Sequence, residues 1–488
     1  MKLNLRGHED RYAIEQSLLA FFPEERPVYE GEDGDSHAEV TLHEGNVYAT
    51  GVTTLTYGGK TARGEARVRT AGVSDAYERE RLRQRALKLS FFRAARDVTG
   101  VTPSWGALTG IRPAKLVRTM LEDGMTPAQA DRVLRDTYCV SPARRRLALE
   151  SAEAGLKARS DLRPEDISLY IGIPFCPTRC AYCSFVSASV EKSFKLMEPY
   201  LAALLHEIEA CAEMAREMGL HIRVGYIGGG TPSSLTTPQL DRLLAHVEKH
   251  FGALAEFTVE AGRPDTLDAQ KLRMLRDHPV TRISINPQTM NDATLTRIGR
   301  AHTAKQTVEA YELARSIGFD DINMDVIAAL PGEDYAMFAH TLAEIRRLRP
   351  ESLTVHTLAI KRSSRLHEEK YAQAEQDVAR MVALGRQTAH DMGMRAYYLY
   401  RQKYMAENLE NVGYALPGRF CRYNIDNMEE TTSILALGAG GISKCVMREE
   451  EKILRAPNIA NIEQYIDRVD EMIERKRIVF AEKAKKLD

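Results

Sequence analysis

Net charge and long apolar runs are what this chain has least of. Its 488 residues carry a formal net charge of −1, so no strongly basic surface indicates nucleic acid or an anionic membrane as a partner. No apolar run reaches the roughly 18 residues of a membrane-spanning helix. The start, MKLNLRGHEDRY, is too polar for the core of a signal peptide. These absences predict a cytoplasmic protein with no nucleic-acid partner and no membrane insertion.

Cysteine is also scarce, and its placement is uneven. The chain has 7 cysteines, and three of them, Cys176, Cys180 and Cys183, lie within the short stretch CPTRCAYC. In a reducing compartment, clustered cysteines more often bind metal or perform chemistry than form disulfides. We interpret the remaining four as ordinary buried thiols: Cys139, Cys211, Cys421 and Cys445.

Length and patterning predict several domains. A chain of 488 residues exceeds one ordinary core. In residues 1–160, HAEVTLHEG and VYATGVTTLTYGG alternate polar and apolar positions, which predicts antiparallel strands. GMTPAQADRVL then predicts a helix with Thr126 as N-cap and Pro127 in its first turn. We therefore expect residues 1–160 to form an α+β accessory domain.

From residue 168 onward, short β-branched runs alternate with helical stretches, which predicts βαβ units and a parallel sheet. The runs are SLYIGI (168–173), IRVGYIG (222–228), FTVEAG (257–262), RISINPQ (282–288), INMDVIAAL (322–330) and SLTVHTLAI (352–360). Polar residues follow or end several of these runs, and ligands bind at the carboxyl ends of such strands. We therefore expect one ligand-binding site at the carboxyl ends of these strands.

The spacing C-x3-C-x2-C places three thiols on one short loop. Structural zinc usually takes four protein ligands, and here only His206 or a remote residue could be the fourth. Three cysteines suit a [4Fe–4S] cluster with one iron open to a non-protein ligand. Zinc and a chance grouping remain the alternatives.

The segment LYIGIPFCPTRCAYCSF (169–185) resembles the radical S-adenosylmethionine (SAM) enzymes, in particular their oxygen-independent coproporphyrinogen III oxidase branch. Within that branch the chain is most similar to the Gram-positive-type coproporphyrinogen dehydrogenases. The resemblance implies a partial (β/α)6 TIM-like barrel over residues 161–365. It also implies a mostly helical region, residues 366–488, that covers the substrate and ends in a solvated helix, ERKRIVFAEKAKKLD.

The same resemblance implies the cofactors and the residues that hold them. Cys176, Cys180 and Cys183 would bind three irons of a [4Fe–4S] cluster, with SAM on the fourth, and two SAM molecules per chain are implied. The residues that match SAM-binding positions are Tyr170, Tyr182, Gly229, Gly230, Thr231, Glu260, Gln288, Arg300, Asp325, Ile327 and Ala359.

These positions have different expected roles. Tyr170 and Tyr182 would contact SAM near the cluster and the adenine, and the backbone of GGGTP (228–232) would meet its methionine end. The polar set Glu260, Gln288, Arg300 and Asp325 would bind the ribose, amino group and carboxylate. The two apolar residues, Ile327 and Ala359, would line the adenosine pockets and face a second SAM.

The implied reaction is the oxidative decarboxylation of two propionates of coproporphyrinogen III to vinyl groups, giving protoporphyrinogen IX in haem biosynthesis. The implied partners are a tetrapyrrole substrate, a flavodoxin- or ferredoxin-like electron donor and an electron acceptor, and a monomer is expected. YYLYRQKY (397–404), Arg179 and Arg362 are candidates for contacts with the substrate, although we interpret the first mainly as ordinary core and surface.

Two departures from the best-known members leave alternatives open. Phe185 stands where they have a fourth cysteine, and Gly172 stands where they have a histidine. A haem chaperone, a radical SAM enzyme that methylates or opens haem, and a zinc scaffold are therefore the rival hypotheses. The long segment ahead of Cys176 disfavours the chaperone.

Overall fold

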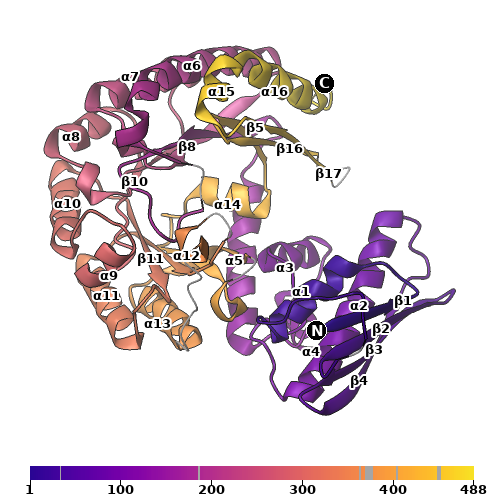
Figure 1. Cartoon of the computed structure of the whole chain (residues 1–488). Coiled ribbons are helices and arrows are strands. Elements are labelled where there is room, and N and C mark those ends of the chain that lie inside the picture. Colours follow the sequence, from indigo (N-terminus) through magenta and orange to yellow (C-terminus); the bar gives the residue numbers. More distant parts are fainter. Residues whose placement is uncertain are drawn as a thin grey trace. The chain divides into compact units, whose positions relative to one another are not determined.

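The computed structural model of the chain describes residues 1–32, 34–184, 187–361, 364–368, 377–402, 405–447 and 452–487 (Figure 1). The backbone forms two compact units, Met1–Leu149 and Glu150–Asp488. Among the described residues, no helix combines the length and apolar character that crossing a membrane requires.

The first unit is a four-stranded sheet with helices. Its elements are β1 (Lys2–Arg6), α1 (Arg11–Phe21), β2 (His37–Glu44), β3 (Tyr48–Tyr57), β4 (Lys60–Arg69), α2 (Ala76–Thr99), α3 (Pro113–Glu122), α4 (Pro127–Asp136) and the start of α5 (Pro142–Ser160). The strands are ordered β1-β2-β3-β4. The predicted antiparallel pairing is confirmed for β2 to β4, whereas β1 joins β2 in parallel. Thr126 caps α4 as predicted, in a capping box with Gln129.

Helix α2 packs directly on the backbone of this sheet. A Cβ on Gly51 would lie 2.6 Å from the carbonyl oxygen of Ala86, and one on Gly64 would overlap that of Ser90. The buried residues Leu87 and Phe91 of α2 complete the apolar core on this face. Two glycines in the strands therefore permit the close approach of the helix.

The second unit contains one large sheet and its covering helices. The strands are β5 (Asp166–Ile173), β8 (His221–Gly229), β9 (Glu256–Glu260), β10 (Arg282–Ser284), β11 (Ile322–Ala328), β12 (Ser352–Thr357), β13 (Arg395–Tyr400), β14 (Asn411–Ala415), β15 (Ser433–Leu437), β16 (Ile442–Met447) and β17 (Lys452–Pro457), with β6 (Phe175–Cys176) and β7 (Ala188–Ser189) as a separate pair. The helices are α6 (Val190–Glu217), α7 (Thr237–Phe251), α8 (Ala269–Asp277), α9 (Asp292–Arg297), α10 (Ala304–Ile317), α11 (Tyr335–Leu348), α12 (Arg365–Glu368), α13 (Val378–Asp391), α14 (Arg422–Glu429), α15 (Ile462–Asp467) and α16 (Val469–Ala484), with 3-10 turns η1 (Pro232–Ser234), η2 (Pro264–Thr266) and η3 (Ala406–Asn408).

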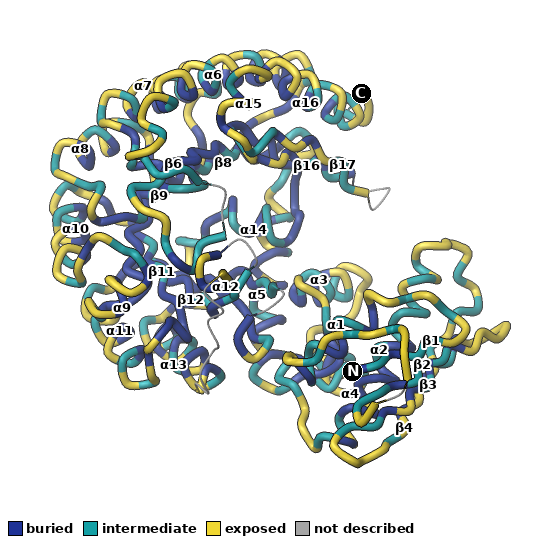
Figure 2. The backbone as a smooth tube through the Cα atoms, viewed as in Figure 1, coloured by how far each residue is buried: buried dark blue, intermediate teal, exposed yellow. Residues whose placement is uncertain are grey.

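The six predicted strands are neighbours in the order β12-β11-β10-β9-β8-β5, and every pair is parallel. Helices α6, α7, α8, α10 and α11 form an arc outside them (Figure 1). The exposed side of this arc faces away from the buried strands (Figure 2). The partial (β/α)6 TIM-like barrel is confirmed.

Residues after 365 extend this sheet at both edges. β15 pairs in parallel with β5, and β14 pairs antiparallel with β12. The described part of the expected mostly helical region therefore also contributes five strands, β13 to β17. Its segment SILAL is buried at every position of β15, because β5 and β16 flank it in the sheet.

The expectation of a solvated tail helix is wrong for one face of α16. Lys476 is fully buried, and its ammonium lies 2.6 Å from the carboxylate of Glu207 on α6. Glu207 also accepts hydrogen bonds from the backbone N–H of Gly438 (2.7 Å) and the hydroxyl of Tyr465 (2.7 Å). The sequence did not indicate that Lys476 is buried, because its partner Glu207 lies far away in the sequence.

Candidate active site at the carboxyl ends of the strands

The cysteine loop continues from β5 and is fixed by its neighbours. Cys176 belongs to β6, which pairs with β7. The backbone N–H of Ala181 donates to Ile298 O (2.9 Å), and Ala181 O accepts from the N–H of Leu366 (3.1 Å). The hydroxyl of Thr178 donates to Gly299 O (2.8 Å). Three half-buried thiols, Cys176, Cys180 and Cys183, are thereby carried on an anchored loop.

The glycine turn after β8 packs against the start of this loop. The N–H groups of Gly230 and Thr231 donate to Ile173 O (2.8 Å) and Phe175 O (2.7 Å). A Cβ on Gly230 would lie 3.0 Å from Cys176 Sγ, and Gly229 has φ of 110°. The hydroxyl of Thr231 lies 3.5 Å from the same sulfur. Glycine is thus required here for close approach and for backbone conformation.

Glu260, the last residue of β9, lies in a buried aromatic environment. The hydroxyl of Tyr226 donates to its carboxylate, and the ring of Tyr226 stacks with that of Tyr170 at 6.4 Å. Burial raises the pKa of Glu260 to about 7, with Asp325 adding to the shift and Tyr226 opposing it. Burial also raises the pKa of Tyr170. This carboxyl group therefore changes charge near neutral pH.

Asp325 on β11 behaves in the opposite way. Burial alone would raise its pKa, yet hydrogen bonding from His356 and Asn323 holds that pKa below its usual value. The side-chain amide of Asn323 donates to Asp325 Oδ1 at 2.8 Å, and His356 Nε2 lies 3.7 Å from Oδ2. Asp325 therefore remains an acceptor at neutral pH.

Gln288 is joined to the main chain of β11 through its own backbone. Its N–H donates to Asp325 O (2.9 Å), and its carbonyl accepts from the N–H of Ile327 (3.0 Å). The residue has φ of 66°, a left-handed conformation that is uncommon for non-glycine residues. Ile327 is buried beside it. Ala359, beyond the end of β12, makes a bridge to Met405 instead.

Arg300 ties Tyr182 of the cysteine loop to two strand ends. One terminal nitrogen donates to the hydroxyl of Tyr182 (3.1 Å), and the other to Gly262 O (3.2 Å) and Asn286 O (3.3 Å). Its Nε is buried with no partner among the described residues. Arg300 therefore orients the tyrosine of the loop as well as offering a charge at the rim.

Two features of the site were missed from the sequence. Helix α14 contacts two neighbouring strands, β8 and β5: Tyr423 stacks on Tyr226 at 4.5 Å, and Asp426 accepts from Ser168 of β5 at 2.6 Å. Arg263, three residues after Glu260, is buried and contacts the cysteine loop. An arginine three residues after a strand end was the only local signal for Arg263.

The candidate substrate contacts are largely occupied in the fold. Tyr397 and Tyr398 of β13 are buried, and Tyr397 stacks on Phe420 at 5.2 Å. Arg401 donates to Asn408 O at 3.0 Å. Tyr400 is half-buried and Arg179 is exposed. Arg362, Lys403 and Tyr404 lie outside the described residues, as does Phe185, which stands in place of a fourth cysteine.

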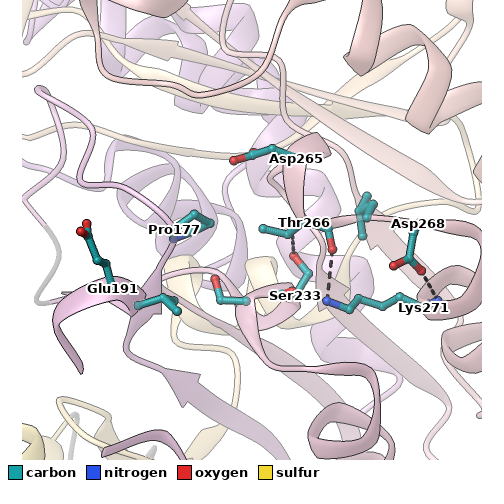
Figure 3. A pocket seen from close by; sticks show the side chains of 10 residues that line it. Pro177, Glu191, Ser233, Asp265, Thr266, Asp268 and Lys271 are labelled. Carbon is teal, nitrogen blue, oxygen red and sulfur yellow. Dashed lines mark hydrogen bonds between the residues drawn. The ribbon is translucent and has the colours of Figure 1, made fainter. Parts of the chain in front are cut away.

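An open pocket of ≈ 550 Å³ lies beside Pro177 of the cysteine loop (Figure 3). Asp265 and Asp268 give it an acidic lining, with Glu191 on the facing helix. The ammonium of Lys271 donates hydrogen bonds to Ser233 O, Leu235 O and Thr266 O at 2.7, 2.9 and 3.1 Å. The residues predicted to bind SAM are not among those that line it.

Comparisons with known proteins agree with this geometry. Residues 170–345 match the Radical SAM superfamily. An oxygen-independent coproporphyrinogen-III oxidase-like protein, HemZ of Bacillus subtilis, is 41% identical over 386 residues, which cover 78% of this chain and 77% of that protein. The chain belongs to this radical SAM family.

Two further relatives set the range of the family. The haem chaperone HemW of Bacillus subtilis is 36% identical over 196 residues, or 40% of this chain and 50% of its own length. The solved structure of coproporphyrinogen III oxidase (HemN) from Escherichia coli has a TM-score of 0.51 at 24% identity, covering 66% of this chain and 73% of that one. This likeness establishes the shared fold.

The cofactors of this family member are a [4Fe–4S] cluster and SAM. The residues present fit them. The three thiols are free of disulfides. Gly230 places no side chain between the glycine turn and Cys176. The buried Nε of Arg300 has no acceptor among the described residues and could donate to a bound group.

Proposed function

We propose that this enzyme converts propionate side chains of coproporphyrinogen III to vinyl groups by SAM-dependent oxidative decarboxylation, giving protoporphyrinogen IX. The observation that carries the proposal is the extent of similarity. The oxidase-like relative matches 78% of this chain at 41% identity, whereas the haem chaperones match between 40% and 62% of it at 27–36% identity. The similarity to the oxidase-like relative is therefore both longer and higher.

When bound, the cluster and SAM supply one-electron reduction and hydrogen-atom abstraction. Each conversion removes a hydrogen atom from a propionate β-carbon, CO2 and one further electron, which an external acceptor takes. An external flavodoxin- or ferredoxin-like donor supplies the reducing electron. The protein positions the groups and excludes water.

We assign the metal-binding role to Cys176, Cys180 and Cys183 on their anchored loop. Gly229, Gly230 and Thr231 would present their backbone to the methionine end of SAM. Tyr182, whose hydroxyl accepts from Arg300, would contact the adenine.

The polar residues at the strand ends are assigned to different groups of SAM according to their charge. Asp325, held ionised, would accept from the ribose hydroxyls. Glu260 and Gln288 would bind the amino group and ribose, and Arg300 would bind the carboxylate with its fork. Tyr170 would contact SAM near the cluster. The apolar residues Ile327 and Ala359 would face the second SAM.

The test is an anaerobic assay. Protein with its reconstituted cluster receives SAM, a strong reductant and coproporphyrinogen III, and mass spectrometry follows the porphyrin products. Two successive losses of CO2 and two hydrogens, with 5′-deoxyadenosine formed, support the proposal. Formation of 5′-deoxyadenosine with unchanged porphyrinogen contradicts it.

Haem delivery is the second candidate, because the haem chaperone of Bacillus subtilis is 36% identical over the shared segment. Stoichiometric haem binding without turnover in the same preparation would favour it. A methylated or ring-opened haem product would instead favour a haem-modifying radical enzyme.

A further inference from the structure

Arg263 joins the end of β9 to the cysteine loop. It is 3% exposed, although it lies in the turn that leads into η2. Its Nη2 donates to the hydroxyl of Thr178 at 3.1 Å, and its Nη1 lies 3.4 Å from Thr178 O and 3.9 Å from Cys180 Sγ. One guanidinium thus reaches both the backbone of the loop and the sulfur of its central cysteine.

A carboxylate fixes the plane of this guanidinium. Asp265 accepts from Nε at 2.9 Å and from Nη2 at 2.8 Å, which is the two-point geometry that arginine forms with carboxylates. His302, which is buried, places its Nδ1 3.5 Å from the same carboxylate. Because Asp265 occupies the edge formed by Nε and Nη2, Nη1 remains directed at the cysteine loop.

The three cysteines differ in their described neighbours. Cys176 has the neutral hydroxyl of Thr231 near its sulfur, whereas Cys180 has a permanent cation. Hydrogen bonds and positive charge at a cluster sulfur stabilise the reduced cluster, which carries one more negative charge, and so raise its reduction potential. Lys361 also interacts electrostatically with Cys183. Cys180 is therefore one position at which a buried cation can change that potential.

We infer that Arg263 is a positioning residue that holds Cys180 and raises the reduction potential of the cluster, with Asp265 setting its direction. The inference deepens the proposed function and rests on its assignment of Cys180 to the cluster. It does not depend on which tetrapyrrole the enzyme takes. A higher potential brings the cluster within reach of a biological electron donor.

The experiment compares three variants of the cluster-loaded enzyme. Arg263→Gln keeps an amide donor but removes the charge and the fork, and Arg263→Lys restores the charge. Arg282→Gln is the matched control, because Arg282 is also 3% exposed and also pairs with an aspartate, Asp321, but begins β10 rather than following a strand. Circular dichroism verifies that each variant is folded.

The main measurement is a redox titration of the cluster followed by electron paramagnetic resonance, without SAM or substrate. Arg263→Gln is expected to lower the equilibrium constant for cluster reduction about tenfold, which equals 59 mV for a one-electron couple. In Arg263→Lys the potential is expected to return part of the way to the wild-type value. In Arg282→Gln it is expected to equal the wild-type value.

A second readout is the rate at which an iron chelator removes the cluster, which should rise in Arg263→Gln as Thr178 loses its anchor. An unchanged potential in Arg263→Gln would overturn the inference, even with faster cluster loss, because a purely structural arginine gives that result. If Arg263→Gln does not fold, Asp265→Asn serves as the replacement, and the same criterion applies. A shifted potential in an enzyme that leaves porphyrinogen unchanged would uphold this inference and refute only the proposed function.

Discussion

The sheets of the two units bury their strands in different ways. In β3, buried and more exposed residues alternate, because α2 covers one face of the sheet. In β9 and β15, nearly every residue is buried, since helices and neighbouring elements cover both faces. Polar side chains are thus spread along the first sheet, whereas in the second they concentrate where the strands end. Because polar side chains from several strands gather at one rim of the second sheet, they can form a ligand-binding site there.

The largest expected effect comes from the cysteine loop itself. Cys176→Ala should abolish the brown absorbance of the cluster and the cleavage of SAM, while circular dichroism shows an unchanged fold. Cys211→Ala, a buried thiol on α6, is the control and should keep both. Retained SAM cleavage in Cys176→Ala would remove the mechanism proposed here.

A large loss of stability is expected when the buried ion pair between α6 and α16 is broken. Lys476→Met leaves Glu207 charged and without its cation, and should destabilise the second unit by about 3–5 kcal/mol in denaturant unfolding. The adjacent Arg477 forms an exposed pair with Glu217, so Arg477→Met should cost about 0–1 kcal/mol. Equal effects of the two changes would contradict the burial argument.

A glycine-to-alanine change should have different effects in the two units: a loss of stability in the first and a loss of cluster and activity in the second. Gly64→Ala forces α2 away from β4 and should cost about 1–3 kcal/mol of unfolding free energy, with SAM cleavage unchanged. Gly230→Ala places a methyl group against Phe175 O and Cys176 Sγ, and should reduce cluster content and SAM cleavage. Cluster iron and 5′-deoxyadenosine are measured for both. Full activity in Gly230→Ala would show that the loop has room to move.

The smallest expected effect is a pH dependence of SAM binding. The pKa of Glu260 is raised to about 7, so the group is ionised above that pH and neutral below it. If its carboxylate binds the amino group, calorimetry should show affinity falling about tenfold one pH unit below the pKa. Glu260→Gln should show no such slope. A wild-type affinity that rises on acidification would mean that the neutral acid is the binding form.

Apoprotein stability should respond to the same group with the opposite sign. The folded pKa of Glu260 lies above its ordinary value, so ionisation opposes folding, and stability declines as pH rises through about 7. Thermal unfolding of the apoprotein at pH 6 and 8 measures this. In Glu260→Gln the difference between these two pH values should shrink.

The six barrel strands and the cysteine motif could be predicted because their signals are local. β-branched runs specify the strands, and the spacing of Cys176, Cys180 and Cys183 is a pattern within eight residues. Arg263 and Lys476 could not be predicted, since each is defined by a partner that folding brings near: the cysteine loop for one and Glu207 for the other. The pairing of β15 with β5 was missed for the same reason.

That pairing has a consequence for the order in which the protein can be completed during synthesis. β5 lies between β8 and β15, and its partner β15 ends at Leu437. A ribosome that has made the chain only through β12 has therefore released β5 with one row of N–H and C=O groups unpaired, as an exposed edge. The cysteine loop continues directly from that edge. Iron delivered to a nascent chain would meet thiols on an unfinished strand, so cluster insertion is best timed after translation has passed residue 437.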